Sequence, residues 1–119
     1  MSLLTIKRRS LKILLIEDSE ILTMLLKHQA KILQVDLTCV DNFNDAIIEL
    51  KNNVFDFIIL DNHLEKENIN GVDKAKELKT YTQAKITLSS ADSCIIQNEW
   101  IDEVIPKSQL ELVNVINLK

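Results

Sequence analysis

Glycine and proline occur only once each in the 119-residue sequence, as Gly71 and Pro106. A single glycine cannot supply the loops G-x-x-x-x-G-K or G-x-G-x-x-G, whose glycines let the backbone approach the phosphates of a nucleotide. Nucleotide binding through either of these loops is therefore excluded.

Cysteine is also scarce, and Cys39 and Cys94 stand far apart with no C-x-x-C or histidine-rich context. We expect two reduced, buried thiols rather than a disulfide framework or a thiolate metal site. No apolar run approaches the roughly 20 residues that cross a bilayer. The N-terminus also lacks the apolar core of a signal peptide. These absences predict a cytoplasmic protein.

Positive charge is not in excess, because 14 lysine and arginine residues face 18 acidic ones and the net charge is −4. This balance does not favour a nucleic-acid-binding surface. The length suits one domain. We expect residues 1–10 to be a lead-in, whose opening MSL resembles an expression-vector remnant, and residues 11–119 to form the domain.

Apolar runs predict five strands along this domain. Residues 12–16 (KILLI) and 57–60 (FIIL) are almost continuously apolar, which is typical of parallel strands buried on both faces. Residues 35–40 (VDLTCV) alternate between apolar and polar side chains, as a half-exposed edge strand does. Two further runs, 85–88 (KITL) and 103–105 (EVI), complete the set.

Helical spacing of apolar residues predicts five helices between and after these strands. Ser19 is a candidate N-cap for the first of them, and Ser108 with Glu111 forms an S-x-x-E capping box for the last. Alternating strands and helices predict an α/β fold, a flavodoxin-like doubly wound five-stranded parallel sheet of order 2-1-3-4-5. The helices are expected near residues 19–33, 43–51, 72–78, 91–100 and 108–119.

Acidic side chains follow the two strands that this order makes neighbours at the centre of the sheet. Glu17 and Asp18 come directly after the first strand, and Asp61 ends the third. Ligands of such sheets bind beyond the carboxyl ends of the strands at this point. Clustered carboxylates repel one another, and a hard cation such as Mg²⁺ relieves the repulsion. The sequence therefore predicts a magnesium site at this edge.

Two more strand ends bring groups suited to a phosphoryl oxygen. Ser89 follows the fourth strand, with Ser90 as the alternative because the register is ambiguous by one residue, and Lys107 follows the fifth. Asp61 is the candidate nucleophile, with Mg²⁺ and Lys107 neutralising the charge of the phosphoryl group. Each residue alone has an ordinary structural explanation. Their occurrence together at four strand ends favours an aspartyl-phosphate site.

The motifs LLIEDSE, FDFIILDNHL, ITLSS and VIPKS together resemble those of response-regulator receiver domains of the CheY-like superfamily, over about residues 11–118. The resemblance implies a signalling module, not an enzyme with a separate substrate. It implies phosphoryl transfer to Asp61 from a histidine kinase or a histidine phosphotransfer protein. It also implies Mg²⁺ on Asp18, Asp61 and the backbone carbonyl of His63, with Glu17 acting through water.

The sequence departs from the family pattern at three positions. Glu65 replaces a proline, Val104 replaces a common aromatic residue, and Ser108 rather than a cis-proline follows the lysine. The loop from Asp61 to Gly71 is also longer than usual, and the His63 side chain within it is expected at most to tune the phosphoryl lifetime.

Two alternative functions remain open at this point. One is a pseudo-receiver that is never phosphorylated, which the intact candidate site disfavours. The other is a small Mg²⁺-dependent phosphohydrolase. Such enzymes typically place a second acid two residues after the nucleophile, where this chain has His63.

Overall fold

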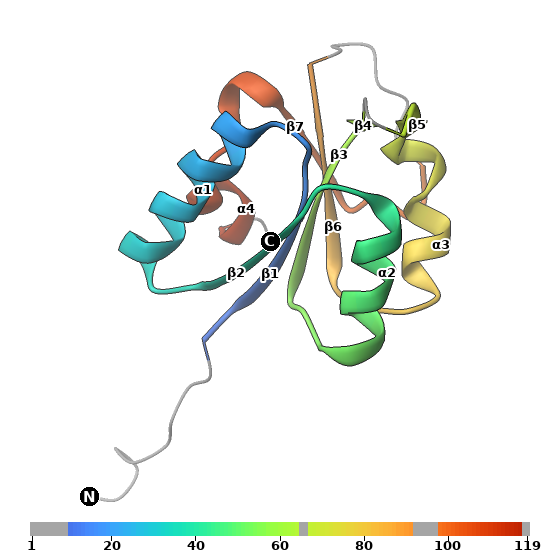
Figure 1. Cartoon of the computed structure of the whole chain (residues 1–119), viewed down its shortest axis with the longest axis horizontal. Coiled ribbons are helices and arrows are strands. Elements are labelled where there is room, and N and C mark those ends of the chain that lie inside the picture. The colour runs from blue at the N-terminus through green and yellow to red at the C-terminus, as the bar shows by residue number, and fades with distance from the viewer. Residues whose placement is uncertain (1–9, 65–66, 92–97, 118–119) are drawn as a thin grey trace, which may run out of the picture.

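The computed structural model describes residues 10–64, 67–91 and 98–117. One parallel sheet has the strand order β2-β1-β3-β6-β7, which confirms the predicted doubly wound topology (Figure 1). A two-stranded antiparallel hairpin, which we did not predict, follows the central strand. The sheet comprises β1 (Lys12–Ile16), β2 (Asp36–Val40), β3 (Phe57–Asp61), β6 (Lys85–Ser90) and β7 (Glu103–Pro106), and the hairpin β4 (His63–Leu64) and β5 (Ile69–Asn70).

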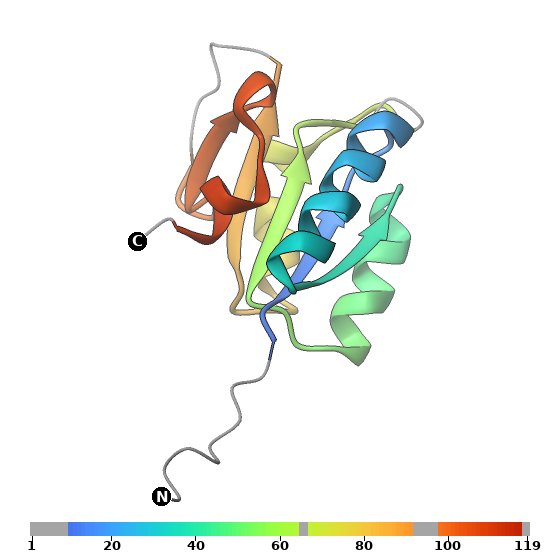
Figure 2. The same ribbon diagram turned by 90° about the vertical axis from the view of Figure 1, so that its left-hand side faces the viewer.

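Helices cover both faces of the sheet (Figures 1 and 2). One face carries α1 (Glu20–Leu33) and α4 (Leu112–Ile116). The other carries α2 (Phe43–Asn52) and α3 (Ala75–Lys79). Two 3₁₀ turns, η2 (Gly71–Asp73) and η3 (Lys107–Gln109), precede α3 and α4. None of the helices in the described ranges is long and apolar enough to cross a membrane.

The protein has two hydrophobic cores, one on each face of the sheet, because successive side chains of β1 point to opposite faces. Ile13 and Leu15 pack beneath α1 and α4, whereas Leu14 and Ile16 pack beneath α2. All four side chains are fully buried, because helices cover both faces of this strand. The edge strand β2 is only partly buried, as its alternating sequence predicts.

The first helix begins as the sequence predicts. Ser19 is its N-cap, and the Ser19 hydroxyl accepts a hydrogen bond from Leu22 N at 3.3 Å. This cap matters for the site, because it starts α1 two residues after Asp18. The turn between β1 and α1 therefore has little freedom, and it holds the acidic pair at the edge of the sheet.

The predicted capping box of the last helix is wrong. Ser108 lies in η3, and α4 begins four residues later at Leu112, where Glu111 makes no side-chain cap bond. A residue of α1 caps this helix instead, because Gln29 Oε1 accepts a hydrogen bond from Leu112 N at 2.8 Å. A side chain from another helix, brought close by packing, thus caps α4 in place of the predicted Ser108.

Several predicted features lie outside the described residues. These are the lead-in 1–9, Glu65, and residues 92–97 with Cys94, where the fourth helix was expected. Cys39 is a free thiol, but it is half-buried rather than buried as predicted. No peptide bond within the described ranges is cis, which includes the bond that precedes Ser108.

Candidate active site

Three carboxylates meet at the carboxyl ends of β1 and β3. Ile16 pairs with Leu60 in the sheet, so that the two strands end at the same level. Glu17, Asp18 and Asp61 then each bring one carboxylate oxygen within 4.8 Å of the others. Glu17 and Asp61 are almost fully buried, while Asp18 is half-buried.

One lysine faces this cluster from the end of β7. Lys107 Nζ lies 3.0 Å from Asp61 Oδ1 and 3.4 Å from Glu17 Oε1. Burial, the largest single influence, lowers the pKa of Lys107, but the hydrogen bond to Asp61 and the charges of both acids outweigh it. The pKa is raised overall, so Lys107 is protonated at neutral pH.

Hydrogen bonds reach only one oxygen atom of each of the two buried carboxylates. Ser19 N donates to Glu17 Oε2 at 3.1 Å, and His63 N donates to Asp61 Oδ1 at 3.2 Å. Within the described ranges, Glu17 Oε1 and Asp61 Oδ2 have no hydrogen-bond partner. Burial and the nearby charge of Asp61 raise the pKa of Glu17 to about 7.

This arrangement fits a hard divalent cation. A buried carboxylate oxygen such as Asp61 Oδ2, with no hydrogen-bond partner among the described residues, is costly, and a single ammonium group cannot neutralise three acids. The donors are all oxygens, which Mg²⁺ and Ca²⁺ prefer over nitrogen or sulfur. The acidic triad is thus consistent with a site for a divalent metal ion.

A hollow of about 330 Å³ opens beside Asp61. Ser90 lies in its lining, whereas Ser89 does not. Ser89 pairs with Asp61 in the sheet but is fully buried, and its hydroxyl has no partner among the described residues. Successive side chains of a strand point to opposite faces, so only one of the two serines can enter this hollow. The lining residues are Asp61, Asn62, His63, Asn70, Ser90, Ala91 and Lys107.

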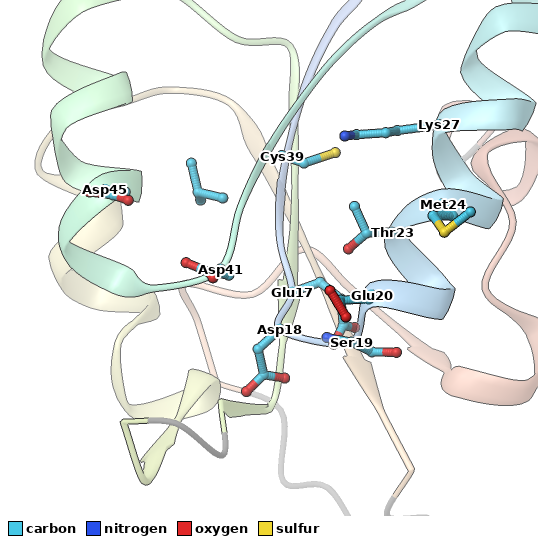
Figure 3. A pocket seen from close by; sticks show the side chains of 11 residues that line it. Glu17, Asp18, Ser19, Glu20, Thr23, Met24, Lys27, Cys39, Asp41 and Asp45 are labelled. Carbon is cyan, nitrogen blue, oxygen red and sulfur yellow. The ribbon is translucent and has the colours of Figure 1, made fainter.

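A second hollow, of about 440 Å³, adjoins the acidic pair on the side of α1 (Figure 3). Glu17 and Asp18 line it, with Met24 and Lys27 of α1 on one side and Asp45 of α2 on the other. Its lining contains five acidic residues and only one lysine. The approach to the site is therefore negatively charged and attracts cations.

Gly71 supports the site in a way that the sequence analysis did not foresee. A Cβ atom at this position would lie 2.5 Å from the carbonyl oxygen of Asp61 and 2.9 Å from Leu60 Cγ. Gly71 N also donates to the carbonyl of Asn62 at 2.6 Å. The only signal in the sequence was that this is the one glycine of the chain.

No protein-family model matches the sequence, and no curated protein matches it either. The fold is similar to that of solved response regulators. A response regulator protein from Burkholderia pseudomallei, solved with a phosphorylated aspartic acid and a calcium ion, has a TM-score of 0.78 at 18% identity. That match covers 90% of this chain and 65% of the other. A CheY-like receiver domain from Methylobacillus flagellatus has a TM-score of 0.77 at 17% identity, over 90% of this chain and 93% of the other.

The response regulator TrrA of Thermotoga maritima is similar as well. In the crystal structure of its complex with the histidine kinase ThkA, the TM-score is 0.73 at 26% identity. The match covers 89% of this chain and 95% of the other. Together these similarities show that the chain has the fold of a CheY-like receiver domain.

Proposed function

We propose that this chain is a phosphoacceptor receiver domain of a two-component phosphorelay, which takes a phosphoryl group onto Asp61. The observation that supports this most strongly is the contact of Asp61 with Lys107 at 3.0 Å inside a cluster of three carboxylates. A buried acid that is paired with a lysine and close to two other acids is a natural acceptor for a metal-bound phosphoryl group.

Asp18, Asp61 and the backbone carbonyl of His63 would hold Mg²⁺, and Glu17 would act through a bound water. Asp61 Oδ2, which is buried and has no hydrogen-bond partner among the described residues, supports this assignment. When bound, the ion would neutralise negative charge on the carboxylates and on the incoming phosphoryl oxygens.

The residues of the chain then have distinct roles in the transfer. A carboxylate oxygen of Asp61 forms a bond to the phosphorus atom of a phosphohistidine donor. The phosphorus–nitrogen bond breaks, and its electron pair stays on the imidazole nitrogen. Lys107 is protonated and half-exposed, so its ammonium group can contact a phosphoryl oxygen. The chain acts on itself and has no separate substrate.

We assign the switching hydroxyl to Ser90 in preference to Ser89. Ser90 lines the hollow that a phosphoryl group on Asp61 would occupy, and Ser89 does not. A hydroxyl that bonds a phosphoryl oxygen only when the group is present links the charge of the site to the chain that follows β6. That link is how phosphorylation would change the binding of an output partner.

We assign the docking of the donor to α1, whose exposed face is unusually apolar. Ile21, Met24 and Ile32 are 83%, 70% and 68% exposed. Ile21, Leu25, His28 and Ile32 follow the 4-3-4 spacing that pairs one helix with another. Because α1 begins beside Asp18, a donor that reaches Asp61 has to cover it. A helical histidine kinase or phosphotransfer protein fits this surface.

Intact mass spectrometry tests the proposal. The protein is incubated with Mg²⁺ and acetyl phosphate, and we expect a gain of one phosphoryl group that requires Mg²⁺. Asp61→Asn should abolish the gain, and the exposed acid at the far end of the sheet, changed in Asp36→Asn, should not. The absence of any Mg²⁺-dependent gain would favour a pseudo-receiver. Repeated turnover of a phosphate ester would favour a phosphohydrolase.

A further inference from the structure

A third hollow, of about 650 Å³, lies at the end of the sheet opposite to Asp61. Its walls are the last turns of α2 and α3 and the loops that lead from these helices into β3 and β6 (Figure 1). Asp61 ends β3, whereas these loops precede the first residues of β3 and β6, so the length of the sheet separates the hollow from the acidic cluster. A volume of this size is typical of pockets for small molecules.

The charge in this hollow is positive. Its lining within the described ranges includes Lys51 and Lys79 and no acidic residue. Lys79 is already neutralised, because its Nζ lies 3.0 Å from Asp102 Oδ2 and donates to the carbonyl of Ala84 at 3.1 Å. Lys51 is exposed and forms no ion pair within the described part of the chain. Its charge is therefore available to an anion.

An aromatic ring lies beside this charge. Lys51 Nζ is 5.7 Å from the centroid of the Tyr81 ring, so the two groups attract each other and link the ends of α2 and α3. Tyr81 is 39% exposed, and Val54, from the other loop, is 74% exposed. The buried Leu50 also lines the hollow. The hollow thus offers an apolar, partly aromatic surface next to one positive charge.

The ends of two helices tend to disfavour an anion, because the last carbonyl groups of a helix carry partial negative charge. Here side chains already bond carbonyl groups at both ends. Asn52 Nδ2 donates to the carbonyl of Ile48 at 2.9 Å, and Thr80 Oγ1 donates to the carbonyl of Glu77 at 2.6 Å. These bonds weaken the repulsion that an anion would meet.

The loops that follow the two helices add hydrogen-bond donors. The backbone N–H groups of Val54, Thr82 and Gln83 donate to no group of the described residues. Backbone N–H groups form strong hydrogen bonds with oxyanions, as lysine ammonium groups do. The hollow therefore combines one lysine charge, three backbone donors and a ring.

We propose that this hollow binds a small organic oxyanion, a carboxylate or phosphate that carries an aromatic or other flat apolar group. The oxyanion contacts Lys51 and the N–H groups of the loops, and the apolar group lies against Tyr81 and Val54. This site is separate from Asp61, and the inference does not rest on the proposed function.

Amide NMR signals of the protein test the proposal, with EDTA present to keep divalent cations from the acidic cluster. The probe is phenylphosphonate, which joins a ring to an oxyanion. We expect it to shift the signals of Val54, Thr82 and Gln83 in a saturable way and to leave that of Asn62 in place. Methylphosphonate, which lacks the ring, and benzyl alcohol, which lacks the charge, should each bind about tenfold more weakly.

Variants of the lining residues identify the groups that bind the probe. Lys51→Gln and Tyr81→Leu should each weaken the binding of phenylphosphonate about fivefold. Lys31→Gln, which removes an exposed lysine from α1, is the matched control and should keep the parent affinity. Asp61→Asn should also bind the probe as the parent does. The same spectra show whether each variant is folded.

Equal binding of methylphosphonate and phenylphosphonate would overturn the inference, because it would reveal only a general attraction to surface lysines. The absence of shifts at the three loop amides, or the loss of binding in Asp61→Asn, would overturn it as well. None of these results bears on phosphoryl transfer to Asp61, so the proposed function would stand.

Discussion

Lys107 lies with its ammonium nitrogen 3.0 Å from Oδ1 of Asp61, and it is the cation paired with both buried acids of the cluster. The ion pair joins the residue that follows the edge strand β7 to the end of the central strand β3, across the intervening strand β6. The pair still leaves net negative charge in the site, and this imbalance underlies the predictions that follow.

Lys107→Ala should destabilise the protein in the absence of divalent cations. Asp61 and Glu17 would then stay buried without a counter-charge, and because the lysine is partly exposed we expect a loss of about 1–2 kcal/mol. Urea unfolding in the presence of EDTA measures this change. Lys31→Ala, on the exposed face of α1, provides the control, and equal losses in the two variants would contradict the prediction.

Glu17→Gln should stabilise the protein at alkaline pH but not at acidic pH. The folded-state pKa of Glu17 is raised from 4.5 to about 7. The folded protein therefore loses stability as the pH rises from 4.5 to 7, because the unfolded state gives up this proton more readily. Below 4.5 the group is protonated in both the folded and the unfolded state and contributes no difference. We expect a gain of about 3 kcal/mol at pH 8 without divalent cations, which vanishes near pH 4.

Urea unfolding at these two pH values checks the gain in Glu17→Gln. The control is Glu20→Gln, which removes an exposed acid from the first turn of α1 and should give no gain. A gain in Glu17→Gln that is the same at both pH values would show that the charge of Glu17 is not its source.

Mg²⁺ should raise the thermal unfolding temperature of the parent protein. Binding to the folded state alone adds about 2.7 kcal/mol when the free ion is at one hundred times its dissociation constant. Asp18→Asn removes one of the clustered carboxylates and should reduce the shift, whereas Asp36→Asn should not. A thermal melt with increasing Mg²⁺ measures it, and an equal shift in all three proteins would contradict the proposed metal site.

Gly71→Ala should be among the more destabilising single changes outside the core. The new methyl group would meet the carbonyl oxygen of Asp61 at 2.5 Å, and backbone cannot yield as a flexible side chain can. We expect a loss of about 2–3 kcal/mol in urea unfolding. Gln34→Gly is a useful contrast, because Gln34 already has a left-handed φ of 59° and glycine should be tolerated there.

Ile21→Glu should slow transfer from a protein donor but not from acetyl phosphate. A carboxylate on the exposed stripe of α1 would disrupt apolar packing with a partner without touching Asp61. The measurement compares the rate of transfer from a phosphorylated histidine phosphotransfer protein, chosen because it is active on the parent, with the rate of transfer from acetyl phosphate. Val54→Glu alters a similarly exposed apolar residue that does not line either hollow of the site and is the control. Equal slowing with both donors would argue against docking on α1.

The sequence predicts the fold and the acidic cluster because both depend on simple periodicities. Continuous apolar runs such as Ile13–Ile16 identify the central strands, and parallel strands end at one edge of the sheet. Glu17, Asp18 and Asp61 therefore had to lie close together once the strand order was known. The role of Ser19 as an N-cap is equally predictable from the sequence, because its capping hydrogen bond joins residues three apart in the chain.

Contacts between distant segments decided the rest. The cap of α4 comes from Gln29, 83 residues before Leu112, which no local pattern indicates. Whether Ser89 or Ser90 reaches the hollow depends on a register of one residue, and short apolar runs do not specify that register.

By itself, the sequence determined the order of the strands and the presence of carboxylates at the centre of their carboxyl edge. Only the tertiary structure decided that Lys107 contacts Asp61 and that His63 and Asn70 wall the hollow beside it. The physical reason is the range of the interactions. The pattern of buried residues depends on the spacing of apolar residues that are close in the sequence. The contacts of loops and side chains depend on segments that meet only after folding.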